Sequence, residues 1–518
     1  MSRLFRAAGS ISAFTLLSRI LGLVRDRLMM QTLGAGWVQG TFLLAWTLPN
    51  LMRRLLGEGA LSAALVPAYA KARREPDPAA ARELLAQVTG TVTVLLLPLC
   101  LGVAALSLLI PAEWLPAPDE GGVAAMRLLL ALNAVLFAYA LPVCLTAVYA
   151  GALNTLGVFA LPAAVPVLLN VFWIGALLLA KPLGYTVDVE IARFAAWCLS
   201  IGGVAQLLLV VLPLWSLGEL RRPRLSLPRR GTAAFGVFVA MGPTVLGMSL
   251  NQISSLLDQL MAYALVAPGA VSYVYLANRL LLFPHALTAM SVAVAVFPKL
   301  AHEANDQDRG QLRRTLDLAA AATILVTLPA AWGLIVLGED VVRVLFVGGR
   351  FTEADVAPTV WTTSFLVAGL PFIGLAQLYA RAFYAVGDPG TPARLAARLV
   401  IANALLNVLL LTTTDLGTAA LALSSSLSSL ANAWWLARRF RTHAAPGHSL
   451  RAAWLRSILA TAAMCATLPL LRVAPDDASL LSRALGDVAL PIGVGIGVYL
   501  LAHVLLRSPE LRALRRRR

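Results

Sequence analysis

The sequence predicts an all-α, polytopic membrane protein, and three observations lead to that class. Of 518 residues, 59% are hydrophobic and only 13% are charged. The mean hydropathy is +0.79, and a soluble fold with so few charged side chains could not cover its surface. Long apolar runs recur without the alternation of transmembrane β-strands, which excludes a β-barrel, and the high apolar content excludes intrinsic disorder.

Apolar runs long enough to cross a bilayer predict about 14 transmembrane helices, since each crossing needs about 20 mostly apolar residues. The runs lie near residues 10–33, 38–56, 88–110, 124–150, 157–180, 191–217, 233–264, 270–297, 315–338, 357–386, 394–412, 416–437, 454–471 and 485–506. The first run is interrupted by arginines and has no small-residue cleavage site, so we interpret it as a span and not as a signal peptide.

The basic residues are distributed unevenly, and this distribution predicts the orientation. The chain has 42 Lys and Arg against 26 Asp and Glu, a formal net charge of +16. Most of the basic residues fall in alternate connecting segments, such as 221–230 and 438–441, whereas the intervening loops are acidic, as at Glu113 and Asp119. The positive-inside rule therefore predicts that both termini are cytoplasmic and that the number of spans is even.

Some arginines lie within the predicted spans instead of in loops. They are Arg19, Arg25, Arg27, Arg53, Arg54, Arg279 and Arg381. They outnumber the acids of the same spans, Asp26, Glu58 and Asp258. Since a charge at the bilayer centre costs at least ~2.5–3.5 kcal/mol, such residues usually face a cavity or a partner.

These intramembrane charges allow two interpretations. Arg27, Arg54 and Arg381 can reach the interface from span ends, and Asp26 can be a structural partner of the arginines beside it. The other arginines come from three different spans, and arginine binds phosphate through a planar fork of donors. We therefore expect a hydrated cationic cavity whose cargo is a phosphate-bearing amphiphile.

An internal repeat predicts the domain organisation. Residues 33–71 and 267–302 both run from a Gly-containing turn through an arginine-bearing helix into a Pro-containing segment. The predicted domains are an N-lobe at 1–218 (spans 1–6), a basic cytoplasmic linker at 219–231, a C-lobe at 232–440 (spans 7–12), and spans 13–14 with a basic tail at 441–518. Two lobes related by a parallel repeat are a known transporter architecture.

Several segments resemble one family. SRILGLVRDRLMMQTLGAG and LPNLMRRLLGEGALSAALVPAYAK are similar to the N-terminal signature of the MurJ/MviN family, and NQISSLLDQLMAYAL, YLANRLLLFP and RAFYAVGDPGTP resemble later family segments in the same order. The resemblance covers most of the chain. It implies a lipid II flippase of peptidoglycan synthesis in the bacterial cytoplasmic (inner) membrane, from the multidrug/oligosaccharidyl-lipid/polysaccharide exporter superfamily.

The resemblance also implies site residues. The family's essential cavity arginines correspond here to Arg19, Arg25, Arg53 and Arg279, which we expect to bind the substrate. Glu58 matches a family acid near the inner gate, and we take it with Asp26 as the candidate gate residues.

At two positions the chain departs from the family pattern. Gly40 and Asn278 stand where the family usually has acids, which puts a coupling or gating role for those acids in doubt.

A possible sodium site follows from polar residues in three spans. Asp258 is the lone acid of its span, and Asn403 and Asn407 lie four residues apart on one helix face. Carboxylate, amide and hydroxyl oxygens suit a small hard cation, and Ser424–Ser426 add hydroxyls. The family has a sodium site built from these spans, although interhelical hydrogen bonding by Asn and Ser explains the same pattern.

No enzyme motif was found, and the sequence lacks a GxxxxGK[ST] P-loop, so we expect no enzymatic activity and no cofactor beyond Na+ as a coupling ion. We expect lipid II or a similar polyprenyl-pyrophosphate glycolipid as partner, and no nucleic acid. A monomer is compatible with the sequence. Two alternatives stay open: an exporter of another polyprenyl-linked glycan, and a non-transporting scaffold that binds lipid-linked precursors.

Overall fold

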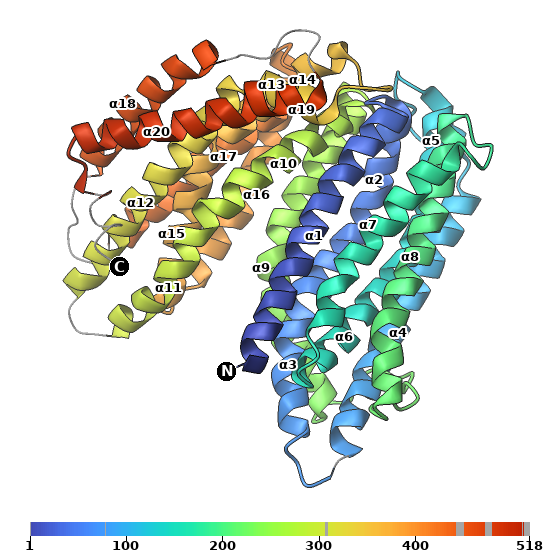
Figure 1. The fold of residues 1–518 in the computed structure, drawn as a ribbon. Coiled ribbons are helices and arrows are strands. Elements are labelled where there is room, and N and C mark those ends of the chain that lie inside the picture. Colours follow the sequence, from blue (N-terminus) through green and yellow to red (C-terminus); the bar gives the residue numbers. More distant parts are fainter. Residues whose placement is uncertain are drawn as a thin grey trace. The chain divides into compact units, whose positions relative to one another are not determined.

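The computed structural model describes residues 2–77, 79–305, 309–441, 450–471, 479–509 and 511. In that part of the chain the regular elements are helices (Figure 1). Nine of the described helices are long and apolar enough to cross a membrane, and the bent pair Ala270–Ala286 and Met290–Ala304 makes a tenth. The prediction of an all-helical, multi-span membrane protein is confirmed.

All of the predicted spans fall on helices over most of their length. Those at 10–33, 38–56, 233–264 and 416–437 do not reach the apolar criterion, although the third includes a shorter apolar helix at Ala233–Gly242. The first contains Arg19 and Arg25, the second is interrupted by a π-helix, and the fourth is rich in serine. The total of about 14 crossings therefore stays a prediction for these more polar helices.

The helices form two compact units. Unit 1 holds the residues up to Leu256 together with Ala267–Val271 and Gly349–Phe351, and unit 2 holds Leu257–Val266, Ser272–Gly348 and the residues from Thr352 on. The helices that begin in unit 1 are α1 (Ser2–Leu33), α2 (Trp37–Met52), η1 (Arg53–Ala60), α3 (Leu61–Ala72), α4 (Ala79–Leu109), η2 (Ala112–Trp114), α5 (Gly122–Leu136), η3 (Phe137–Tyr139), α6 (Ala140–Thr155), α7 (Ala160–Ala180), α8 (Asp188–Ser216), α9 (Ala233–Met261) and α10 (Ala270–Leu287).

Unit 2 contains most of α10 and the rest of the chain. Its other helices are η4 (Ala262–Val266), α11 (Ala289–Asn305), α12 (Arg309–Val336), α13 (Gly338–Phe346), η5 (Glu353–Asp355), α14 (Val356–Ala368), α15 (Leu370–Ala385), α16 (Gly390–Thr413), α17 (Thr418–Phe440), α18 (Arg451–Thr467), η6 (Leu468–Leu471), α19 (Leu480–Arg483), η7 (Ala484–Ala489) and α20 (Leu490–Leu505). The C-terminal helices α18 and α20 lie side by side (Figure 1).

An aromatic cluster forms the part of the unit 1 core nearest the site. Trp173 of α7 packs edge-on against Phe42 and Trp46 of α2, with ring centroids 5.7 and 5.0 Å apart. Trp46 also contacts Tyr139, whose hydroxyl donates to Oε1 of Gln206 on α8 at 3.1 Å. Tilted aromatic pairs contribute ~0.5–1.5 kcal/mol beyond burial, so the cluster fixes α2 and α7 beside α1.

The core of unit 2 lies between α11, α12, α15 and α17. Its buried side chains include Leu316, Tyr379, Phe383 and Phe440, and the rings of Phe383 and Phe440 meet edge-on at 5.2 Å. Apolar positions along each helix recur at helical spacing, which places them on the inward face. This packing holds α16 and α17, which carry two of the polar clusters described below.

Two short segments complete unit 1 at the ends of α1 and α2. The N–H of Gly269 donates to Oε2 of Glu120 at 3.4 Å, and the N–H of Trp37 donates to Oε1 of the same carboxylate at 3.1 Å. The N–H of Arg350 donates to the carbonyl of Gln31 at 2.9 Å, and its side chain pairs with Asp188. Backbone hydrogen bonds therefore hold both segments, 267–271 and 349–351, in unit 1, and an ion pair adds to the attachment of the second.

The basic segment 219–231 is docked on unit 1. The N–H of Arg224 donates to the carbonyl of Ala86 at 3.1 Å, and its side chain pairs with Glu83 at 2.7 Å. The close approach requires a glycine in α4, because a Cβ on Gly90 would overlap the carbonyl of Arg224. The segment therefore lies along the start of α4 instead of acting as a loose tether.

Candidate functional site

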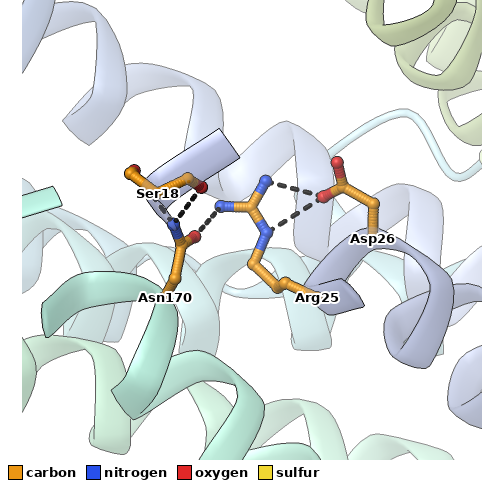
Figure 2. A network of polar contacts seen from close by, with 4 residues as sticks. All are labelled: Ser18, Arg25, Asp26 and Asn170. Carbon is orange, nitrogen blue, oxygen red and sulfur yellow. Dashed lines mark hydrogen bonds and ion pairs between the residues drawn. The ribbon is translucent and has the colours of Figure 1, made fainter. Parts of the chain in front are cut away.

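The first candidate arginine to have a defined environment is Arg25 on α1 (Figure 2). Its Nε and Nη2 donate to Oδ1 of Asp26 at 2.9 and 2.6 Å, and its Nη1 donates to Oδ1 of Asn170 at 3.1 Å. The guanidinium carbon lies 4.5 Å from the ring centroid of Trp173. The Asn170 amide in turn donates to the carbonyl of Ser18 at 3.1 Å. Figure 2 shows this continuous network from Ser18 to Asp26.

Helical spacing explains why these groups meet. Ser18 and Arg25 are two turns apart on one face of α1, and Asn170 and Trp173 are neighbours on the facing side of α7. Arg25 is 8% exposed and Asp26 is 1% exposed. A buried charge is stable only when it is paired and hydrogen-bonded, so the network is what allows Arg25 to sit within α1.

Arg19 and Arg53 have more open environments than Arg25. Arg19 lies on α1 and is exposed. Arg53 begins the π-helix η1, is half-buried, and donates from Nε and Nη2 to Oδ1 of Asn50 at 3.1 and 2.9 Å. Single π-turns inside longer helices are frequent at functional sites, and here the turn follows Pro49 and carries two consecutive arginines. The Glu58 side chain, although predicted as a gate residue, lies outside the described part of η1.

Arg279 belongs to unit 2. It is half-buried on α10, with its guanidinium carbon 6.0 Å from the ring centroid of Tyr275 one turn earlier. Asn278 beside it is exposed, and its amide donates to the carbonyl of Val274 at 2.9 Å. Asn278 therefore hydrogen-bonds to the preceding turn of its own helix, at the position where the resemblance leads one to expect an acid.

Gly40 has a steric explanation. It is buried on α2, and a Cβ built on it would overlap the carbonyl of Pro268 in the segment that completes unit 1. A Cβ on Gly269 would likewise overlap the carbonyl of Ala35, at 2.4 Å. A side chain at position 40, acidic or not, would push this segment away, so glycine allows a backbone contact there in place of a carboxylate.

Three helices bring the predicted sodium ligands together in unit 2. The Asn407 amide donates to Oδ1 of Asp258 at 2.7 Å, and the Asn403 amide lies 3.3 Å from the same oxygen. The hydroxyl of Ser425 is 3.4 Å from Oδ2 of Asp258. Asn403 Oδ1 accepts from Ser424 and Ser428 at 2.8 and 3.0 Å. Sequence reasoning missed the last of these, although it stands one helical turn after Ser424.

The donor set fits a small hard cation better than a transition metal. Oδ1 of Asn407 is buried and has no hydrogen-bond partner among the described residues. In the described ranges no group of three or more His, Cys, Asp or Glu side chains is placed to hold a metal ion. One carboxylate with amide and hydroxyl oxygens is a set that Na+ accepts and Zn2+ does not.

Sequence reasoning also missed the partners of Arg25. Asn170 and Trp173 both lie in an apolar run, and the signal that could have identified Asn170 is its isolation there, since a lone amide within a span is costly without a partner. Nothing in the sequence singled out Trp173 from the other tryptophans.

Comparison with known proteins gives one consistent result at the level of sequence. Residues 29–475 match the family model described as "Lipid II flippase MurJ". The chain is 31% identical to "Probable lipid II flippase MurJ" of Vibrio cholerae over 99% of its own length and 98% of that protein. It is 32% identical to "Lipid II flippase MurJ" of Burkholderia cenocepacia over 78% of each.

Solved structures agree in fold. The structure titled "Lipid II flippase MurJ, inward closed conformation" superposes with a TM-score of 0.75 at 23% identity, covering 96% of this chain and 99% of that one. An inward-facing multidrug resistance transporter of the MATE family and MOP superfamily matches with a TM-score of 0.63 at 16% identity, over 82% and 95%. At these identities the likeness concerns the fold alone.

Proposed function

The chain belongs to the MurJ family of lipid II flippases, and from this premise we propose which of its residues move the lipid. It is a transporter of the peptidoglycan precursor lipid II and not an enzyme, and it is a multi-pass membrane protein. The observation that supports the residue assignment is that α1 carries both an exposed arginine, Arg19, and a buried one, Arg25, in a built network.

In this proposal Arg19, Arg53 and Arg279 bind the pyrophosphate of lipid II directly. All three are more exposed than Arg25, and a guanidinium can donate two parallel hydrogen bonds to phosphate oxygens. Hydrogen bonds from several arginines replace the water that the phosphate charges lose when they enter the membrane.

Arg25 and Asp26 have a different role in the proposal. Because Asp26 holds two donors of Arg25, an entering pyrophosphate competes with the Asp26 carboxylate for the same donors. Exchange of the carboxylate for phosphate would free Asp26 from its partner, which makes the pair a charge-operated gate. Glu58 is proposed as a second gate acid on the strength of the family resemblance.

The energy source in this proposal is an ion gradient or the membrane potential, which is worth ~2.3 kcal/mol per charge per 100 mV. Asp258, Asn403 and Asn407 would hold Na+. The buried Oδ1 of Asn407 supports this role, because a cation would give that oxygen the partner it lacks among the described residues. Cytoplasmic N- and C-termini, with lipid II entering from the inner leaflet, complete the proposal.

The experiment is complementation of a strain depleted of its lipid II flippase. Arg19→Ala, Arg53→Ala and Arg279→Ala should each fail to restore growth while accumulating in the membrane at wild-type levels. Arg127→Ala is the matched control, since Arg127 of α5 is exposed and pairs with the exposed Glu113 of η2, and it should complement fully. Full complementation by all three of the first variants would overturn the arginine assignment.

A second measurement separates the alternatives. Purified protein in vesicles is given lipid II or another polyprenyl-pyrophosphate glycan, and the fraction accessible in each leaflet is followed over time. Selective movement of lipid II supports the proposed cargo, and equal movement of the other glycan favours the broader exporter. Binding without movement in vesicles that hold a sodium gradient and a membrane potential is the outcome expected of a scaffold.

A further inference from the structure

A basic pocket in unit 2 lies away from the residues discussed so far. It is formed where α16 begins and α17 ends, and its volume is about 170 Å³. Arg394 and Arg398 of α16 and Arg439 of α17 line it with Trp435 and Thr391. A single water needs only ~15 Å³ of such space, so the pocket can hold a phosphate with its ester groups.

The pocket is arranged to present positive charge. The three arginines and Trp435 are exposed, while Leu395 and Leu436 beneath them are 8% and 1% exposed and form an apolar floor. The guanidinium carbon of Arg439 lies 5.6 Å from the ring centroid of Trp435. Arg394 Nη2 is 3.3 Å from the hydroxyl of Thr391. Stacking and hydrogen bonding restrain both side chains, so less entropy is lost when a ligand binds.

The nearby acid does not cancel this charge. Asp388 precedes α16, and its Oδ1 accepts the N–H of Thr391 at 3.1 Å, as a helix-capping carboxylate does. Among the described residues at the pocket, one carboxylate stands against three arginines, and the amino-terminal end of the 24-residue helix α16 adds a positive partial charge. The local balance therefore favours an anion.

An apolar stripe continues from the arginines along α16. Positions 394, 398, 401, 405 and 409 share one helix face, and Ile401, Leu405 and Leu409 are 65%, 68% and 55% exposed. From Arg398 to Leu409 the helix rises about 16 Å at ~1.5 Å per residue. That is close to half of a ~30 Å hydrocarbon core, the depth that one lipid chain occupies.

We propose that this pocket binds the phosphodiester headgroup of an anionic phospholipid whose acyl chains lie along the exposed face of α16. Basic pockets between transmembrane helices on the cytoplasmic side suit such headgroups, and a tryptophan at this level anchors the helix at the interface. The apolar stripe distinguishes a lipid from free phosphate, which would gain nothing from it. The site takes a structural lipid, and it goes beyond the transport of lipid II.

The test uses the full-length protein in a neutral detergent and native mass spectrometry of bound lipids. Phosphatidylglycerol is titrated against phosphatidylethanolamine with the same acyl chains. The wild type should prefer phosphatidylglycerol, and Arg394→Gln and Arg398→Gln should each weaken its binding about fivefold, the equivalent of ~1 kcal/mol per arginine. The triple variant with Arg439→Gln should lose about a hundredfold.

Arg438→Gln is the matched control. Arg438 is the neighbour of Arg439, is also exposed, and stacks on Trp434 at 5.4 Å instead of lining the pocket, so its loss should leave the lipid preference unchanged. Thermal melting of each variant monitors folding, and the two single variants keep the test decisive if the triple variant fails to fold.

Four results would overturn the proposal. They are equal binding of the two phospholipids, unchanged affinity in the single variants, displacement of phosphatidylglycerol by inorganic phosphate at equal concentration, and displacement by undecaprenyl pyrophosphate at stoichiometric amounts. The last result would assign the pocket to the cargo. Failure of the transport proposal has a separate signature, which is unchanged transport by Arg19→Ala. That variant should keep phosphatidylglycerol binding whether or not it transports lipid II.

Discussion

At the scale of single residues, Arg25 shows how a charge can be retained inside an apolar helix. Its carboxylate partner is the next residue, its amide partner comes from α7, and its ring partner Trp173 covers one face. Each contact compensates part of the hydration lost on burial. Removing one partner from such a set is therefore more damaging than replacing the whole pair by apolar side chains.

Asp26→Ala should lower the free energy of unfolding by about 3–5 kcal/mol, because it leaves the Arg25 guanidinium buried without its carboxylate. Thermal and denaturant unfolding in detergent measure the loss. The double variant Arg25→Met with Asp26→Leu should recover most of this stability and still fail to complement. If the double variant complements, the pair is structural only.

Gly40→Ala should destabilise unit 1 by about 1–3 kcal/mol, since the added methyl group forces the carbonyl of Pro268 away from α2. Gly40→Asp, which introduces the acid that the family resemblance suggests, should be worse. Gly102→Ala on α4 is the control, because a Cβ there meets nothing within 4 Å. Unchanged melting temperatures for both Gly40 variants would contradict the steric account.

Asp258→Asn should abolish stabilisation by sodium. At constant ionic strength, replacing KCl by NaCl should raise the melting temperature of the wild type, because an ion that binds only the folded state stabilises it. Asn407→Ala should behave like Asp258→Asn. Asp415→Asn, an exposed acid near the same helices, should retain the wild-type response, and a wild type indifferent to the cation would remove the proposed site.

At the scale of helices, close backbone approaches decide where connecting segments lie. Gly90 of α4 allows residue 224 to pass directly over it, and the ion pair of Arg224 with Glu83 fastens the contact. Glu219 adds a second attachment through Arg73 at 3.1 Å and Tyr69 at 3.2 Å. The backbone of the basic segment is thereby held along α4, while its arginine side chains stay exposed.

Gly90→Leu should release the backbone of this segment, whose arginine side chains are already exposed, so that it can enter the active site of trypsin. Limited proteolysis should then cut within residues 221–230 several times faster than in the wild type, and Gly102→Leu should leave the cleavage rate unchanged. Equal rates in all three proteins would mean that the docked arrangement does not protect the segment.

The sequence predicted the helices better than it predicted the contacts between them. Apolar runs of sufficient length identified the spans, because a bilayer enforces that length. The partnership of Arg25 with Asn170 joins residues 145 positions apart, and no local pattern encodes it. The sequence also did not predict the π-turn at Arg53 or the close contact between Gly40 and the carbonyl of Pro268, because such backbone geometry leaves no hydropathy pattern. Asp258, Asn403 and Asn407 were found because polar residues are conspicuous within spans.

At the scale of the whole molecule, orientation follows from charge. The positive-inside rule predicts that residues 219–231 face the cytoplasm and that Glu113 and Asp119 face the outside. In a background with the four native cysteines replaced, a cysteine at position 226 should react only with membrane-permeant reagent, and one at position 119 also with impermeant reagent. The opposite pattern in intact cells would reverse the predicted topology.

The adjacency of Arg25 and Asp26 also affects how the protein is made. A lone arginine entering the bilayer costs at least ~2.5 kcal/mol on insertion scales. Here the counter-charge is the very next residue to be synthesised, and the two are hydrogen-bonded within one helix. The first helix can thus leave the insertion machinery already neutralised at this point, long before the segment carrying Asn170 has been translated. Asn170, the later partner, adds a hydrogen bond to a guanidinium whose charge Asp26 has already neutralised during insertion.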